Sequence, residues 1–322
     1  MSRPYVFMTM DVPEVAKRMI AEVAELHVWQ GEYPIPKERL MEEAARADCL
    51  YTMVSDSVDE EVLRAGATGK LKLVANMAVG YDNINIPVAK ELGIAVTNTP
   101  DVLTETTADL TFALLMATAR RLVEASNYLH AGRWKSWSPL LLAGQDIYGA
   151  TLGIVGMGRI GEAVARRAKG FNMNILYFNR NRKPRAEEEL GVTYRPFEEL
   201  LKEADFVVCL TPLTEETRHL FGAREFSLMK KSAVFINVSR GGTVDEAALY
   251  QALVNGEIWA AGLDVFQTEP VPLDNPLLKL DNVVALPHIG SASIPTRTRM
   301  ATLAAENVVA VLQGKEPLTP VF

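Results

Sequence analysis

A strand, a glycine turn and a helix follow one another between residues 151 and 169, and this stretch constrains the fold more than any other. A short apolar run typical of a buried strand leads directly into Gly156-Met-Gly-Arg-Ile-Gly161, and the residues after the motif have helical spacing. The first glycine permits a tight turn, the second lets a phosphate approach the backbone, and the third allows close packing of helix on strand. Amide groups at the start of the helix favour an anion. The stretch therefore predicts a dinucleotide site, against the alternative of a purely structural turn.

Strands and helices alternate along nearly the whole chain, which is typical of parallel pairing in open α/β sheets. We expect two doubly wound, Rossmann-like domains with parallel sheets. The last helix, over 293–313, follows the final strand and is expected to pack back on the first domain. The expected domains are thus 1–99 plus 288–322, which binds substrate, and 100–287, which binds the dinucleotide. Predicted strands cover 5–9, 26–29, 49–54, 71–77, 94–98, 152–155, 174–178, 205–210, 233–238, 259–265 and 282–286, and the longer predicted helices cover 12–25, 36–46, 101–121, 162–169, 196–203 and 244–254.

Composition excludes several classes of protein. The chain has 322 residues, of which 48% are hydrophobic, and its net charge of −7 argues against nucleic-acid binding. No apolar run reaches the roughly 18 residues of a membrane span, and no signal peptide is visible, so we expect a cytoplasmic protein. Cys49 and Cys209 lie in apolar runs and are interpreted as buried thiols. No spacing of histidine, cysteine and acidic residues predicts a metal site.

A segment ahead of the glycine motif has the character of a contact surface. The predicted helix at 101–121 is so densely apolar that we expect it to be buried between domains or at a subunit contact. Residues 132–144 follow with two tryptophans and little periodicity. A monomer would have difficulty covering such a segment, so 121–149 is predicted to be the dimerisation arm of a homodimer.

Three candidate catalytic residues follow successive strands of the second predicted sheet: Arg240, Glu269 and His288. Each one alone has an ordinary structural interpretation as a turn residue. Together, beyond the carboxyl ends of parallel strands, they fit the reduction of a 2-keto acid. Arginine binds a carboxylate through two parallel hydrogen bonds, histidine transfers a proton, and a carboxylate on the second ring nitrogen orients and charges the histidine.

At this point the chain resembles a known family, the D-isomer-specific 2-hydroxyacid dehydrogenases, and within it the glyoxylate/hydroxypyruvate reductases. The resemblance spans nearly the whole chain. It implies two doubly wound domains with an interdomain cleft, a dimer, and a small 2-keto or 2-hydroxy acid as substrate. The motifs that carry it are Asn76-Met-Ala-Val-Gly-Tyr-Asp-Asn-Ile, Gly156-Met-Gly-Arg-Ile-Gly161, Asn237-Val-Ser-Arg-Gly-Gly-Thr-Val-Asp-Glu-Ala-Ala-Leu249, Gly262-Leu-Asp-Val-Phe-Gln-Thr-Glu-Pro270 and Pro287-His-Ile-Gly-Ser-Ala292.

The resemblance also implies roles for individual residues. Arg240, Glu269 and His288 form the catalytic set, and His288 donates the proton in reduction. The substrate is implied to contact Val79 and Gly80 through their backbone, Arg240, His288, Ser291 and, from the partner subunit, Trp137, for which ordinary interface packing is the alternative. The cofactor is implied to contact Thr107, Gly156, Gly158, Arg159, Ile160, Gly161, Thr211, Pro212, Val238, Asp264 and Gly290.

The choice of cofactor can be predicted from one departure from the common pattern. An NAD site has an acidic residue about 20 residues beyond the motif, for the ribose 2′-hydroxyl. This chain has Asn179 there, followed by Arg180, Arg182 and Lys183. Such cations suit the 2′-phosphate of NADPH, so we predict NADPH, with NADH as a weaker cofactor and a solvated cationic face as the alternative. Arg180 is the first candidate for the phosphate contact because it directly follows Asn179, and Arg182 is the second. Two other functions stay open: a reductase of a longer sugar acid such as 2-ketogluconate, and a non-catalytic NAD(P)-sensing corepressor on the same fold.

Overall fold

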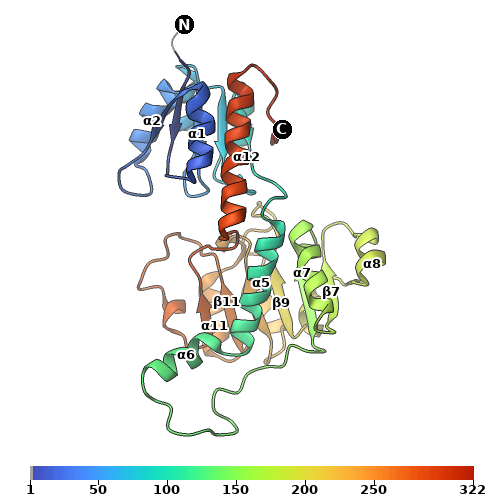
Figure 1. Cartoon of the computed structure of the whole chain (residues 1–322). Helices are drawn as coiled ribbons and strands as arrows, with labels where there is room; N and C mark the ends of the chain where they lie inside the picture. Colours follow the sequence, from blue (N-terminus) through green and yellow to red (C-terminus); the bar gives the residue numbers. More distant parts are fainter. Residues whose placement is uncertain (1–2) are drawn as a thin grey trace. The chain divides into compact units, whose positions relative to one another are not determined.

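The structure, a computed structural model, describes residues 3–322 and divides the chain into two compact units (Figure 1). The smaller unit comprises the chain up to Leu103 together with Ser291–Phe322, and the larger unit comprises Thr104–Gly290. Each unit is built on one parallel sheet, so the predicted fold class is confirmed. No helix in the described range 3–322 is both long enough and apolar enough to cross a membrane.

The smaller unit has a five-stranded sheet in the order β2-β1-β3-β4-β5, in which neighbouring strands are parallel. Helix α12 packs beside α1 and against β3 and β4, so the C-terminal helix belongs to this unit (Figure 1). Its elements are β1 (Tyr5–Met8), α1 (Glu14–Val23), β2 (Glu25–Val28), α2 (Lys37–Arg46), β3 (Cys49–Thr52), α3 (Glu60–Ala67), β4 (Leu73–Asn76), α4 (Ile86–Glu91), β5 (Ala95–Thr97) and α12 (Ile294–Leu312).

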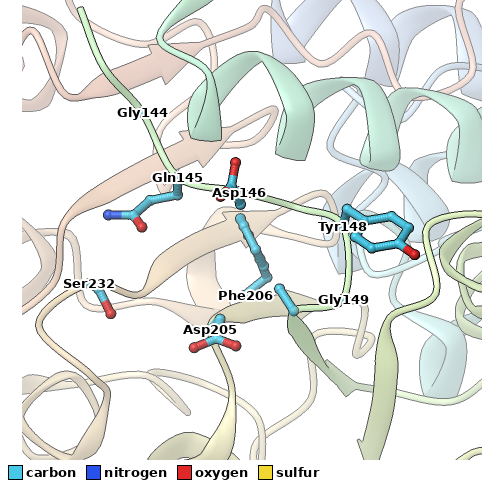
Figure 2. A pocket seen from close by; sticks show the side chains of 9 residues that line it. Gly144, Gln145, Asp146, Tyr148, Gly149, Asp205, Phe206 and Ser232 are labelled. Atoms are coloured by element: carbon cyan, nitrogen blue, oxygen red, sulfur yellow. The ribbon is translucent and has the colours of Figure 1, made fainter. Parts of the chain in front are cut away.

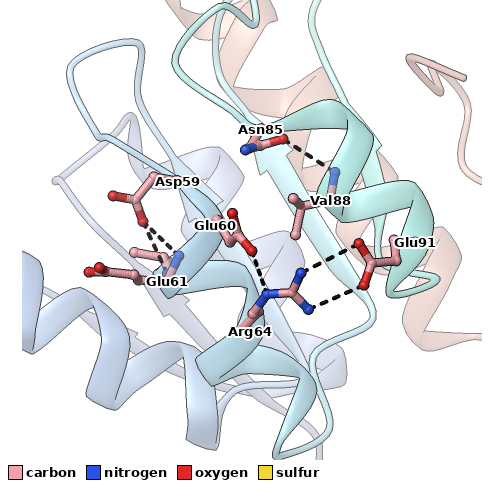
Figure 3. Close-up of polar contacts among 8 residues, drawn as sticks. Asp59, Glu60, Glu61, Arg64, Asn85, Val88 and Glu91 are labelled. Atoms are coloured by element: carbon pink, nitrogen blue, oxygen red, sulfur yellow. Dashed lines mark hydrogen bonds and ion pairs between the residues drawn. The ribbon is translucent and has the colours of Figure 1, made fainter.

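Side chains fix the start of α3 and tie it to α4, as Figure 3 shows. Asp59 Oδ1 accepts hydrogen bonds from the backbone amides of residues 61 and 62, and so satisfies amides that have no partner inside the helix. Asn85 caps α4 in the same way through the amide of Val88. Arg64 on α3 binds Glu60 on its own helix and Glu91 on α4, so the ion pairs join the two helices.

The larger unit has a seven-stranded parallel sheet in the order β12-β11-β10-β9-β6-β7-β8. The strand order reverses between β6 and β9, which is where open α/β sheets bind ligands. Its elements are α5 (Thr104–Ala119), α6 (Leu122–His130), β6 (Thr151–Val155), α7 (Arg159–Lys169), β7 (Asn174–Phe178), α8 (Pro184–Leu190), β8 (Thr193–Tyr194), α9 (Phe197–Glu203), β9 (Phe206–Cys209), α10 (Ala223–Leu228), β10 (Val234–Asn237), the 3-10 turn η1 (Gly241–Thr243), α11 (Glu246–Val254), β11 (Ala260–Leu263), the 3-10 turn η2 (Pro276–Lys279) and β12 (Val283–Ala285).

Both faces of the larger sheet are buried, which explains why its central strands are apolar throughout instead of alternating. Ile154, Val208 and Ile236 pack into the core on one face. Their chain neighbours Val155 and Val207 pack into the core on the other face. The sheet is therefore held rigidly between helices, and its loops carry the groups available for chemistry.

Helix α5 packs against β10, β11, β12 and α7 of the larger unit, so its buried residues cover the sheet of its own unit. Five short elements had no clear signal in the sequence: α4, α6, α8, β8 and α10. Four of them have at most seven residues, and the nine-residue α6 buries none of its residues, so no buried apolar face marks it in the sequence.

Candidate dinucleotide and catalytic site

The glycine motif forms the turn between β6 and α7 at the point where the strand order reverses. Gly156 has a φ of +106°, and a Cβ there would lie 2.7 Å from the carbonyl carbon of Leu210. A Cβ at Gly161 would lie 2.5 Å from the carbonyl oxygen of Gly156. At Gly158, by contrast, no atom of the described chain lies within 4 Å of a Cβ position. Two glycines are thus required by the fold, while the middle one leaves space open.

The beginning of α7 fits the pyrophosphate of a dinucleotide. The helix starts at Arg159 with Gly158 as its N-cap, and no side chain caps it. Its first amides are therefore available to an anion, and the helix dipole favours negative charge there. Ile160 packs against the core beside the turn, while Arg159 is exposed. The open space at Gly158 and the uncapped amides are what a bound phosphate requires.

The residues predicted to select the cofactor divide into different roles. Asn179, after β7, accepts a hydrogen bond at 2.8 Å from the backbone amide of Met157 and so holds the glycine turn against this strand. Arg182 turns away from that position. It forms an ion pair with Glu187 at 2.6 Å, and its guanidinium lies 5.5 Å from the centre of the Tyr194 ring.

Arg180 lies on the exposed loop between Asn179 and Arg182. Its charge helps to lower the pKa of Glu216, although the hydrogen bond from Thr214 is the main cause of that shift. Glu216 is thus an acidic residue whose charge interacts with that of Arg180.

The other predicted cofactor residues gather around Gly290. A Cβ at Gly290 would meet Asp264 Oδ2 at 3.2 Å and methyl carbons of Thr107 and Val238 at 3.5 Å. Thr211 borders the glycine turn, because its amide nitrogen would lie 2.8 Å from a Cβ at Gly156. Pro212 follows, and its carbonyl accepts a hydrogen bond from Thr217 at 2.6 Å.

His288 and Glu269 form the central pair of the candidate catalytic site. His288 Nδ1 lies 2.7 Å from Glu269 Oε2, and Glu269 Oε1 accepts the amide of Phe266 at 3.0 Å. Partial burial acts to raise the pKa of Glu269, but the hydrogen bond and charge of His288, the Phe266 amide and the charge of Arg240 outweigh it. The pKa therefore lies below its usual range.

The second ring nitrogen of His288 is not used by the His288–Glu269 pair. Within residues 3–322, Nε2 has no hydrogen-bond partner, and the side chain is 30% exposed. His288 also has a φ of +53°, a conformation that costs energy for residues other than glycine and is found mainly at functional sites.

Asp264 holds the backbone that carries His288, a role that the sequence did not reveal. This side chain is 1% exposed and follows β11 directly. Its two oxygens accept the amides of Ile289 at 2.7 Å and Gly290 at 2.8 Å. Burial raises the pKa of Asp264 in spite of these two bonds. An acidic residue directly after a buried strand was the available signal.

Arg240 completes the set at the end of β10. Its carbonyl accepts hydrogen bonds from Asn237 Nδ2 at 3.1 Å and Thr243 Oγ1 at 2.7 Å, and its Nη1 donates to the Ser239 carbonyl at 2.9 Å. Because β10, β11 and β12 are neighbours in the sheet, their carboxyl ends bring Arg240, Glu269 and His288 to one edge.

The remaining predicted residues belong to the smaller unit or to the predicted arm. Val79, Gly80 and Ser291 belong to the smaller unit. Trp137 lies in the loop after α6, with 80% of its surface exposed. Two residues of the smaller unit that had no predicted role, Asn76 and Asn98, hydrogen-bond the carbonyls of Gly80 and Val79.

A cavity of about 370 Å³ lies at the opposite edge of the larger sheet (Figure 2). It is bordered by residues 144–150 and by Asp205, Phe206 and Ser232, which lie at or before the starts of β9 and β10. Asp205 is satisfied there by the amide of Thr151 at 2.9 Å and by Lys230 at 2.8 Å. The cavity is therefore separate from the glycine turn and the His288 cluster, which lie beyond the carboxyl ends of the strands.

Comparison with known proteins identifies the family. Residues 112–290 match the model for the D-isomer specific 2-hydroxyacid dehydrogenase, NAD binding domain. A glyoxylate reductase from Korarchaeum cryptofilum is 53% identical over 316 residues, which cover 98% of this chain and 95% of that protein. The chain belongs to the D-isomer-specific 2-hydroxyacid dehydrogenase family. The predicted family and the predicted NAD(P)-dependent dehydrogenase class are thus confirmed, and the corepressor alternative falls away.

Solved structures agree with this assignment. A protein from Thermus thermophilus is 46% identical, and its structure matches with a TM-score of 0.92. The match covers 99% of this dehydrogenase and 100% of the other chain. An NADPH-dependent glyoxylate/hydroxypyruvate reductase from Sinorhizobium meliloti, in complex with NADP and malonate, is 35% identical. The match covers 99% of this chain and 97% of the other chain, with a TM-score of 0.85.

The glycine turn predicts opposite effects for two alanine substitutions. Gly158→Ala should leave the free energy of unfolding nearly unchanged, because space is open there, but should weaken NADPH binding by roughly tenfold or more through a methyl group in the phosphate position. Gly156→Ala should lower the free energy of unfolding by about 1–3 kcal/mol through its φ and its contact with the Leu210 backbone. Urea unfolding and NADPH fluorescence titration measure the two quantities. Unchanged NADPH affinity in Gly158→Ala would contradict this assignment of the open space.

Proposed function

We propose that this dehydrogenase reduces a small 2-keto acid, glyoxylate or hydroxypyruvate, to the D-2-hydroxy acid with NADPH. The observation that carries the proposal is the 2.7 Å pair of His288 Nδ1 and Glu269 Oε2, with Arg240 at the adjoining strand end. The relatives named as glyoxylate reductases support the substrate class, and the relative described with NADP and malonate supports the cofactor. The larger unit binds the dinucleotide in this proposal, and the smaller unit supplies backbone amides for the substrate.

In this mechanism the nicotinamide, when bound, supplies a hydride to the carbonyl carbon of the substrate. His288 holds a proton on Nε2 and donates it to the carbonyl oxygen. Glu269 accepts a hydrogen bond from the N–H group at Nδ1, which orients the ring, and its negative charge favours the charged form of the ring. Arg240 is assigned to the substrate carboxylate, which its planar guanidinium can bind through two hydrogen bonds. The amides of Val79 and Gly80 are assigned to the substrate carboxylate by resemblance. Ser291 is assigned to the substrate by resemblance.

Proton donation by His288 predicts a pH dependence with a definite sign. Reduction needs the protonated ring, so its rate should fall as pH rises, while oxidation of the hydroxy acid should become faster. Because the lowered pKa of Glu269 keeps this carboxylate charged at neutral pH, Glu269→Gln removes a charge that favours the protonated ring. The fall in reduction should therefore begin at lower pH in this variant, as measured by kcat/KM against pH.

His288→Asn should lose roughly 10²–10⁴-fold in rate, as expected for loss of a general acid. His219→Asn is the matched control, because His219 lies in the same unit and has a similar φ of +51°. Asparagine tolerates that backbone conformation at both positions. Near-normal turnover by His288→Asn would remove His288 from the mechanism.

Arg180 is proposed to bind the 2′-phosphate of NADPH. The support is that Arg182 is already paired with Glu187 and stacked on Tyr194, while Asn179 holds the glycine turn. A charge-assisted contact to phosphate corresponds to a preference of roughly tenfold to a hundredfold. NADH remains a weaker cofactor in this proposal, because most of the nucleotide contacts are common to both.

One assay tests the function and the cofactor together. The wild-type protein should oxidise NADPH with glyoxylate or hydroxypyruvate, with a larger kcat/KM for NADPH than for NADH. Arg180→Ala should reduce that ratio by roughly tenfold, whereas Arg182→Ala should leave it unchanged. Turnover of neither keto acid would overturn the proposed function. Equal kcat/KM for the two cofactors in the wild type would overturn the NADPH preference alone.

The arm at 121–149 is proposed to join two copies of this chain. Helix α6 buries none of its residues, and Trp137 and Leu140 have 80% and 82% of their surface exposed. Exposed apolar area of this kind marks an interface, and tryptophan is frequent among the residues that dominate binding energy. We assign Trp137 to the substrate site of the partner subunit.

Light scattering should give a homodimer, and mixed dimers test the role of Trp137. In the first mixed dimer, one chain carries His288→Asn and its partner carries Trp137→Ala. The only intact His288 then belongs to the chain whose partner keeps Trp137, so this dimer should keep activity. A chain with both changes, paired with the wild type, should be impaired. Equal activity in the two mixed dimers would show that Trp137 serves only in packing at the interface. A monomer in light scattering would overturn the assignment of 121–149 as a dimerisation arm.

A further inference from the structure

The turn after β4 presents two backbone amides that no protein group satisfies. Val79 and Gly80 follow Asn76-Met-Ala at the carboxyl edge of the smaller sheet, and both are only partly buried. Among the described residues 3–322, neither amide has a hydrogen-bond acceptor. Amides at a partly buried position normally find a partner, so a ligand with acceptor oxygens is the expected partner here.

Peptide planarity explains how these amides are aimed. In a trans peptide the carbonyl oxygen of one residue and the amide of the next point in opposite directions. The Ala78 carbonyl accepts the backbone amide of Thr99 at 2.8 Å, which turns the Val79 amide away from the 98–99 segment. The Val79 carbonyl accepts Asn98 Nδ2 at 2.8 Å, which turns the Gly80 amide away in the same manner. Both amides are thus held by donors from the segment after β5.

A third carbonyl in the turn is fixed by a buried side chain. Gly80 O accepts Asn76 Nδ2 at 3.1 Å. Asn76 is 0% exposed, and its Oδ1 accepts Thr52 Oγ1 at 3.1 Å. The carbonyls of three consecutive residues are therefore all bound to the protein, and the peptide planes between them cannot rotate without breaking a hydrogen bond.

Asn98 is itself held on both sides by the C-terminal segment. Its carbonyl accepts Thr319 Oγ1 at 2.6 Å, and its amide donates to the Thr319 carbonyl at 3.3 Å. Thr319 in turn binds Asn307 of α12, whose Nδ2 donates to Thr319 Oγ1 at 2.9 Å and whose Oδ1 accepts the Thr319 amide at 3.0 Å. Asn307 is 0% exposed. The orientation of Asn98 is thus set from the core of the smaller unit.

We propose that Asn98 is a positioning residue for the substrate carboxylate, and that Thr319 positions Asn98. The Asn98 side chain keeps the Gly80 amide directed outward, parallel to that of Val79, so that a carboxylate can accept both at once. The inference rests on the proposed function, because it presumes that the anion on these amides is the substrate carboxylate. Asn98 does not contact the substrate; it acts through the Val79–Gly80 peptide.

Two variants test whether the hydrogen-bond donor of Asn98 or only the shape of its side chain is needed. Asn98→Asp keeps the shape but presents acceptors to the Val79 carbonyl, and Asn98→Ala removes the side chain. Both should raise KM for glyoxylate by roughly tenfold, as for a loosened hydrogen bond to a charged group, with a much smaller change in kcat. Thr319→Val should also raise KM for glyoxylate, but by a smaller factor than the Asn98 variants. This variant replaces them in the test if the Asn98 variants do not fold. Asn85→Ala is the matched control, because it removes an asparagine cap from α4 of the same unit without touching the turn.

A second readout does not depend on turnover. Oxalate, a planar carboxylate close to glyoxylate in size, should shift the amide resonances of Val79 and Gly80 in the wild type and in Asn85→Ala. In Asn98→Asp the Gly80 shift should be lost. Absence of glyoxylate turnover in the wild type, with the oxalate shifts intact, would reject the proposed function and leave the anion site standing. A KM and a Gly80 shift in Asn98→Asp equal to those of the control would overturn the positioning role.

Discussion

Parallel strand pairing is the constraint on which the chemistry of this chain depends. When all strands of a sheet run the same way, their carboxyl ends lie at one edge. The loops that leave this edge carry polar groups that have no hydrogen-bond partner in the sheet. In the larger unit, β10, β11 and β12 lie side by side in this order, so Arg240 and His288, almost 50 positions apart in the sequence, leave the same edge of the sheet with only β11 between their strands. In the smaller unit, the turn after β4 meets the segment after β5 for the same reason.

Two acidic residues in the larger unit, Asp264 and Glu269, have pKa values shifted in opposite directions by their surroundings. Asp264 is buried, and desolvation raises its pKa although two amides bind it. Glu269 is 35% exposed, and the charges of His288 and Arg240 lower its pKa against the effect of burial. Asp264 therefore binds the backbone of the loop that carries His288, whereas Glu269 binds the His288 ring itself.

The sequence predicted the sheets well because their strands are continuous apolar runs and their turns contain glycine. It also placed Arg240, Glu269 and His288 in the loops that follow three strands of the larger sheet. It did not reveal that helix α5 packs on its own sheet, because an apolar helix in that position has the same composition as one at a subunit contact. It ranked Arg180 before Arg182 only from the position of Arg180 next to Asn179, because the partner of Arg182 is Glu187, on a short helix that the sequence did not indicate. Asn98 was missed because its hydrogen bond joins two loops that are 19 residues apart.

The two units offer amides to an anion by different means, and the difference follows from what comes after each strand. In the larger unit, β6 passes directly into α7, so uncapped amides and the helix dipole are present at once, and glycine supplies only the space. In the smaller unit, no helix begins after β4 until Ile86, so the Val79 and Gly80 amides have no dipole behind them. Their direction must come from the opposite ends of their peptides, whose carbonyls are held by Thr99 and Asn98. In the proposed function, amides held in this way lose little conformational freedom when the substrate binds, and Thr99 and Asn98 would do for the smaller unit what the helix start does for the larger one.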